Sequence, residues 1–90
     1  MKLYEVTTVE MNNDKTDIIG EYPYYLGTDF EAAKKAKSDL ITRNDVHLTA
    51  REKEVQFVEA RIWEVSDDLD LSDDDAVTDA ICECGGYDVF

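Results

Sequence analysis

The stretch VQFVEARIWEV, residues 55 to 65, decides the fold of this chain. It is rich in β-branched and aromatic residues, which favour extended strands. Val58, Ala60 and Ile62 recur at every second position, and this period gives a strand one continuous apolar face. We therefore predict a strand over Val55–Val65.

A helix is the alternative for the same stretch. Thr49 and Glu52 have the spacing of a capping box, in which each side chain bonds the other residue's backbone N–H. Val55, Val58 and Ile62 also recur at helical spacing. We favour the strand because of the β-branched and aromatic content.

The residues at the start of the chain predict a β-hairpin. Leu3–Met11 is dense in β-branched residues, as is typical of a strand, and Asp17–Leu26 has the pattern of a returning strand. Asn12–Lys15 is typical of a turn, because Asn and Asp tolerate a left-handed backbone. Pro23 has no N–H for a ladder, so we expect its strand to lie at an edge or to be bulged there.

A helix is predicted after the hairpin. Thr28 and Glu31 form a second capping box at its start. We expect the helix to run to about Arg43 and to stop at Asn44. Its predicted buried stripe comprises Phe30, Ala33, Ala36 or Lys37, Leu40 and Ile41.

A second helix is predicted near the end of the chain, after the acidic linker Ser66–Leu71. We expect Ser72 to cap it, with aspartates 73–75 in the first turn, where the helix dipole favours negative charge. Gly85–Gly86 is a typical helix end. Tyr87–Phe90 is expected to add a short strand or to pack as an apolar tail.

These elements follow the order ββαβα, with residues 45–54 forming a loop or the beginning of a further strand. We predict an α+β fold, in which a small antiparallel sheet of three to four strands is packed by two helices on one face. Ninety residues correspond to one domain, 1–90, with an acidic C-terminal helical segment at 66–86.

Negative charge is concentrated late in the chain. The net charge is −13, and ten acidic residues but no basic one follow Arg61. Such a surface repels nucleic acid and anionic membranes and attracts cations or basic proteins. We therefore expect a basic protein as the partner, and direct binding neither to nucleic acid nor to membranes. The predicted partner-binding residues are Asp67, Asp68, Asp70, Asp73, Asp74, Asp75, Asp79 and Glu83.

Catalytic and redox motifs are not evident. Cys82 and Cys84 would diverge by about 200° on a helix, so both thiols cannot easily reach one metal ion. His47 is the only histidine. The chain has no nucleophile elbow and no glycine-rich phosphate loop. We expect a protein that is not an enzyme and that takes no cofactor.

A calcium loop is a weaker candidate in the acidic segment. Asp68 and Asp70 have the spacing of its first ligands. The position that requires glycine for a sharp turn holds Asp73 instead, and the last ligand would be the short Asp79. A weak cation-binding module therefore remains an alternative function.

In size and charge distribution the chain resembles the small acidic inhibitors encoded by phages and mobile elements, which include anti-CRISPR and anti-restriction DNA mimics. The resemblance implies a non-enzymatic inhibitor that blocks the basic site of a nucleic-acid-binding protein. A small homodimeric interaction domain is another alternative, in which Lys34, Lys35 and Lys37 meet the acidic segment of a second copy. We expect a cytoplasmic protein, because Met1–Lys2 is followed by a mixed polar stretch rather than a signal peptide.

Overall fold

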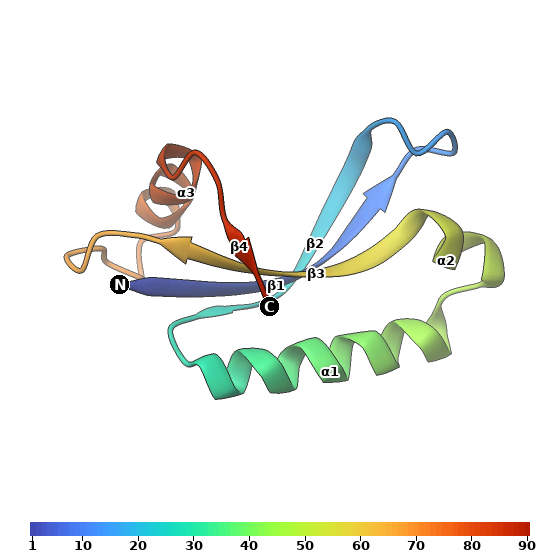
Figure 1. Cartoon of the computed structure of the whole chain (residues 1–90), viewed down its shortest axis with the longest axis horizontal. Coiled ribbons are helices and arrows are strands. Elements are labelled where there is room, and N and C mark those ends of the chain that lie inside the picture. The colour runs from blue at the N-terminus through green and yellow to red at the C-terminus, as the bar shows by residue number, and fades with distance from the viewer.

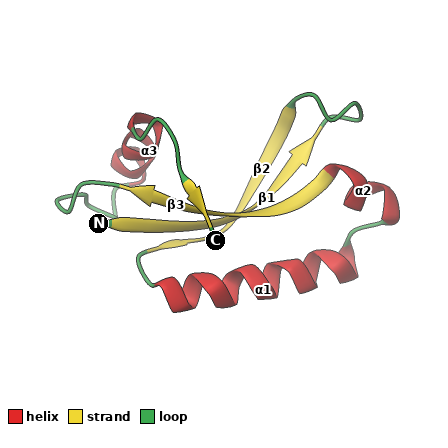
Figure 2. Ribbon diagram, in the orientation of Figure 1, coloured by secondary structure: helices red, strands yellow, loops and turns green.

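The computed structural model describes all 90 residues as an α+β fold with a four-stranded antiparallel sheet and three helices. A long helix runs below the sheet and a short one lies above one end of it (Figures 1 and 2). The predicted order ββαβα is correct in its main elements but lacks α2 and β4. The elements are β1 (Lys2–Met11), β2 (Ile18–Gly27), α1 (Phe30–His47), α2 (Ala50–Val55), β3 (Gln56–Glu64), α3 (Asp74–Glu83) and β4 (Asp88–Val89).

Strand β1 is the centre of the sheet, whose strand order is β2-β1-β3-β4. It pairs antiparallel with β2 on one side and with β3 on the other. Leu3, Val6 and Val9 on this strand are fully buried. Because neighbouring residues of a strand point to opposite faces, β1 is covered on both faces of the sheet.

The expectation for Pro23 is confirmed, since β2 is an edge strand with an irregular register at that point. Val6 lies opposite Tyr25, whereas the next residue, Thr7, lies opposite Pro23. Tyr24 is therefore the extra residue of a bulge. A second register shift lies near the turn. Bulges increase strand twist, and the hairpin bends away from α1 (Figure 1).

The strand pattern of residues 55–65 and the helix signal of Thr49 and Glu52 are both present in the structure, with the helix first and the strand after it. Residues 56–64 form β3, as predicted. The capping box of Thr49 and Glu52 is also formed, with N···O distances of 3.2 and 3.0 Å, and it opens the six-residue helix α2. The prediction of a loop or strand at residues 45–54 was wrong, because α1 and α2 occupy most of that segment.

The larger core lies between α1 and the sheet. Val6 and Ala60 from the strands pack with Ala36 and Leu40 from the helix. The predicted stripe is correct for Ala33, Ala36 and Leu40 and wrong for Phe30 and Ile41, which remain exposed. Although Phe30 is exposed, its ring contacts the rings of Tyr4 and Phe90.

Helix α3 covers one end of the opposite face, so the prediction of both helices on one face was wrong. Val77 of α3 packs with Leu3 and Trp63 in a second, smaller core. Leu3 and Val6 lie on opposite faces of β1 because their spacing is odd. Apolar side chains on both faces of the central strand require a cover on each.

The helix boundaries differ from the predicted ones in similar ways. Asp29 caps α1 in place of Thr28, and Asp73 caps α3 in place of Ser72. Each aspartate accepts hydrogen bonds from backbone N–H groups of the first turn. Helix α1 also passes the predicted stop and ends at His47.

The C-terminal residues adopt both of their predicted arrangements. Gly85 has a left-handed backbone, with φ of 70°, which ends α3 in the expected way. Asp88–Val89 then pairs with β3 as the short strand β4. Phe90 packs against the larger core, and Lys37 donates a hydrogen bond to its carbonyl oxygen.

Candidate acidic interface

The eight predicted binding residues lie on α3 and in the loop that precedes it, a region (residues 66–84) that we call the acidic lobe. All eight are exposed. None pairs with a lysine or an arginine; Asp67 alone has a cationic partner, the N-terminal amine, at 2.6 Å. The structure therefore brings these carboxylates together on one part of the molecule, largely without counter-charges.

Hydrogen bonds within the loop order part of this lobe. Ser72 donates to Asp70 through both its backbone N–H and its hydroxyl, at 3.0 and 2.6 Å. These bonds lower the pKa of the Asp70 carboxyl. A hydrogen bond from the N-terminal amine and its positive charge lower the pKa of Asp67 in the same way. Both side chains therefore stay negative into mildly acidic solution.

Helix α3 divides its residues between two faces. Val77 is buried, and Ile81 and Cys84 pack against the same core. Asp75, Asp79 and Glu83 follow one another at intervals of four residues and so form a stripe on the exposed side. Their backbone positions are about 6 Å apart along the helix axis.

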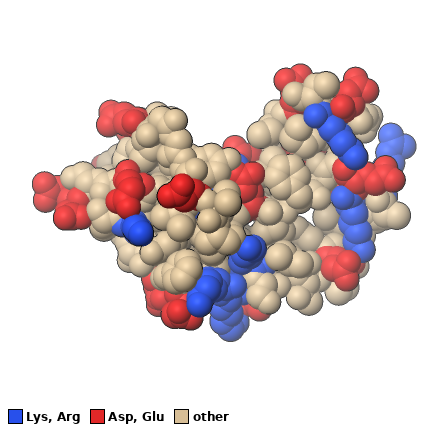
Figure 3. All heavy atoms as spheres, in the orientation of Figure 1, with Lys and Arg blue, Asp and Glu red and all other residues tan.

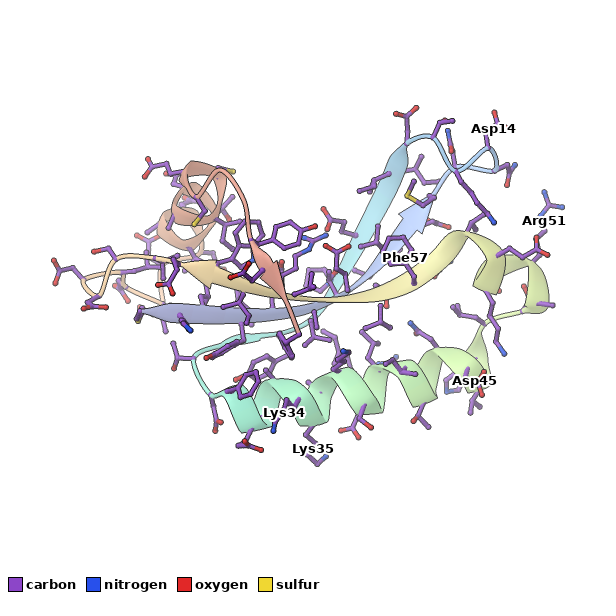
Figure 4. The ribbon with its side chains drawn as sticks, viewed as in Figure 1. Asp14, Lys34, Lys35, Asp45, Arg51 and Phe57 are labelled. Carbon is purple, nitrogen blue, oxygen red and sulfur yellow. The ribbon has the colours of Figure 1, made fainter.

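The basic side chains lie mainly elsewhere. Lys34 and Lys35 project from α1 on the side away from the sheet (Figure 4). They pair with Glu31 and Asp39 of the same helix, at 3.1 and 2.8 Å. Figure 3 shows red acidic atoms at the top, tip and front of the lobe at the left, and most of the blue basic atoms over α1 and the opposite end.

Arg61 forms a charge cluster that sequence reasoning missed. Its guanidinium group bonds three carboxylates, with Nε 2.7 Å from Glu59, Nη1 3.2 Å from Glu5 and Nη2 2.6 Å from Glu21. The arginine side chain is only 9% exposed. Three negative charges around one positive charge leave this cluster at −2, so Arg61 is unavailable to neutralise the acidic lobe.

Two aromatic residues complete the Arg61 cluster. Trp63 donates its indole N–H to Glu5 at 3.2 Å, and the Tyr87 hydroxyl donates to Glu59. Burial raises the pKa of Glu59, but the hydrogen bonds from Tyr87 and Arg61 and the arginine charge outweigh it, so the net pKa is lowered. The available signal was the period of two, which places residues 59, 61 and 63 on one face of β3.

The candidate metal ligands do not gather in the structure. No group of three or more His, Cys, Asp or Glu side chains is placed to hold a metal ion. Cys82 and Cys84 are both free thiols, and Cys84 donates to the backbone carbonyl of Glu64 at 3.0 Å. In the proposed calcium loop, Asp70 already bonds Ser72 and Asp73 already caps α3.

The structure thus defines an α+β protein with a densely acidic lobe at one end. Comparison with protein-family models, with curated proteins and with solved structures finds no match. None of its helices is long and apolar enough to cross a membrane.

Proposed function

We propose that this chain is a non-enzymatic inhibitor whose acidic lobe occupies the basic site of a nucleic-acid-binding protein. The observation that carries the proposal is the set of eight exposed carboxylates, none of which pairs with a lysine or arginine. A basic protein groove offers the counter-charges that the chain itself does not provide. The type of inhibition is the one implied by the resemblance to anti-CRISPR and anti-restriction proteins.

The charge density supports competition with nucleic acid. The ten residues of α3 span about 15 Å. Duplex DNA carries one charge per roughly 1.7 Å, or about nine charges over that length. The lobe as a whole carries eight carboxylates, a similar number, of which four lie on α3 and four in the preceding loop and at the helix cap. The stripe on α3 alone has one charge per about 6 Å, so the loop residues are needed to approach the density of the duplex.

The mechanism is electrostatic steering followed by exclusion of the true ligand. A field of one sign raises association rates by roughly 10–10³-fold at low salt. Because screening shortens the field to about 10 Å at 0.1 M salt, inhibition should weaken steeply as salt is added. The lobe needs no chemistry of its own for this action.

The test is displacement of a fluorescent duplex or guide RNA from a panel of basic nucleic-acid-binding proteins, including CRISPR effectors and restriction enzymes. We expect the parent chain to displace the ligand from at least one member. The variant D73N/D74N/D75N/D79N should be at least tenfold weaker. Asparagine caps a helix about as well as aspartate, so α3 should persist.

A matched control separates the lobe from net charge. The variant D14N/D17N/E31Q/E54Q removes the same number of charges from exposed positions outside the lobe; Asp14 lies at the far end of the molecule (Figure 4). It should inhibit almost as well as the parent. If the lobe variant and the control are equally active or equally weakened, the lobe is not the inhibitory surface.

Homodimerisation is a second candidate, favoured by the free edge of β2. Ile18, Ile19 and Tyr22 on this strand are 55%, 63% and 54% exposed. Exposed apolar edge strands pair readily with another strand, although Pro23 interrupts the ladder. Light scattering after size exclusion should give a dimer mass for the parent and a monomer mass for I19K. A monomeric parent at high concentration would remove this candidate.

A further inference from the structure

A cavity with both polar and apolar walls lies between the C-terminal half of α1 and the sheet. The three buried residues of α1 are Ala33, Ala36 and Leu40, all in its first eleven positions. The helix then continues straight for a further two turns while the bulged hairpin bends away from it (Figure 1). The two surfaces diverge, and a cavity of about 370 Å³ opens between them. Its size is at the small end of the range for ligand sites.

The walls of this cavity differ in chemistry. Tyr22 and Tyr24 from β2 and Leu40 from α1 supply apolar surface. Asn44 lines it as well and donates its side-chain N–H to Thr8 at 2.9 Å, which fixes the orientation of the amide. Such side chains favour a planar ring as the ligand, because aromatic rings stack or pack edge to face with one another.

The cavity also carries cationic and donor groups without partners. Arg43 and His47 lie four residues apart on the same side of α1, and both line the cavity. Neither side chain makes a hydrogen bond or an ion pair within a protein that has 22 acidic residues. The carboxylates close to this surface are already engaged. Glu10 accepts from the Tyr22 hydroxyl at 2.7 Å and from the Gln56 amide at 3.3 Å, and Asp39, one turn before Arg43 on α1, pairs with Lys35 at 2.8 Å.

We propose that this cavity binds a small aromatic anion, a planar ring that carries one phosphate or carboxylate group. Arg43 would hold the acidic group, because a guanidinium fork matches the oxygens of both groups. His47 would donate a further hydrogen bond, and the two tyrosines would enclose the ring. The C-terminal dipole of α1 opposes an anion at His47, which lies in the last turn, and acts less at Arg43, one turn earlier. The site lies away from the acidic lobe and is independent of the proposed inhibition.

The test is an NMR titration of the intact chain at constant ionic strength with four probes: phenyl phosphate, benzoate, inorganic phosphate and benzyl alcohol. Saturable shifts at residues around Arg43 and Tyr24 are expected with phenyl phosphate, benzoate or both, and the stronger of the two identifies the acidic group. Inorganic phosphate lacks the ring and benzyl alcohol lacks the charge, so each should bind at least tenfold more weakly.

Variants distinguish a built site from diffuse attraction. R43Q should weaken the better probe roughly tenfold or more, the loss expected for a charged hydrogen bond. R51Q removes another exposed arginine at the same end of the molecule, outside the cavity (Figure 4), and should leave affinity unchanged. The proposal is overturned if no probe saturates, if the neutral or ring-free probe binds as tightly, or if both variants lose affinity equally.

Discussion

Replacing Arg61 with glutamine removes the only cation from three clustered carboxylates and tests how far this cluster stabilises the fold. Breaking one side of a buried ion pair costs about 3–5 kcal/mol. Glu21 is 44% exposed, whereas Glu5 and Glu59 are 15% and 19% exposed, so we expect the lower end, about 3 kcal/mol at pH 7. A domain of this length is stable by about 5–13 kcal/mol. The melting temperature should fall by roughly 12–24 °C.

The loss should depend on pH, and the sign follows from Glu59. Its folded pKa is lowered in the parent, so its contribution to stability is present above the unfolded pKa of about 4.3 and is lost as pH falls through the folded value. Without Arg61 the carboxylates repel one another, which raises their folded pKa values, and protonation then relieves the variant. The difference between parent and variant should therefore be largest at pH 7 and should shrink below about pH 5.

Urea unfolding monitored by Trp63, the only tryptophan, measures this difference at pH 7 and at pH 4.5. K35Q is the matched control, because it removes the same charge from an exposed helical pair. Exposed pairs contribute little, so its midpoint should be nearly unchanged. A loss below about 1 kcal/mol for R61Q, or the same loss at both pH values, would refute the reasoning.

Three further outcomes are expected. V77A should lower the free energy of unfolding by about 1.5–3 kcal/mol, because Val77 packs α3 against the smaller core. It should also shift Trp63 emission to the red, and unchanged emission would contradict this. D73A should cost about 1 kcal/mol by loss of the α3 cap, and S72A clearly less; the reverse order in urea unfolding would restore Ser72 as the cap. The melting temperature of the parent should rise from low salt to physiological ionic strength, because salt screens repulsion within the lobe. That of D73N/D74N/D75N/D79N should rise less. If calorimetry gives both proteins the same dependence of melting temperature on salt, these acids do not repel one another.

Local sequence patterns predicted most of the sheet. They placed the caps of α1 and α3 one residue too early. Alternation and turn chemistry located the hairpin and β3 within one or two residues. At both helix starts, however, an aspartate follows a threonine or a serine. These residue types cap helices almost equally well, so sequence alone cannot choose between Thr28 and Asp29 or between Ser72 and Asp73. The structure uses the aspartate in both cases.

The sequence predicted only those parts of the candidate site that depend on residues close together in the chain. Consecutive aspartates before an apolar stripe predict carboxylates in the first turn of a helix, because the free N–H groups and the helix dipole favour negative charge there. The Arg61 cluster depends on Glu5, 56 positions away, and on the pairing of three strands. The cavity beside Arg43 depends on the divergence of a straight helix from a bulged hairpin. The alternation in β3 puts residues 59, 61 and 63 on one face, but no local pattern encodes the partners from other strands or the cavity.

The excess of negative charge on the lobe reduces the stability of the free protein, which supports a role in binding. Helix α3 has ten residues, fewer than the roughly 12–15 at which isolated helices become even marginally stable, so it depends on docking. Its anchor is a cluster of three buried residues, smaller than the core under α1. Repulsion among the lobe carboxylates weakens this attachment further. A partner that binds the docked lobe would return about 2.7 kcal/mol at a concentration one hundred times its Kd. In the proposed complex the same carboxylates would weaken the free lobe and stabilise the bound one, which is the relation expected of a surface that binds a cationic partner.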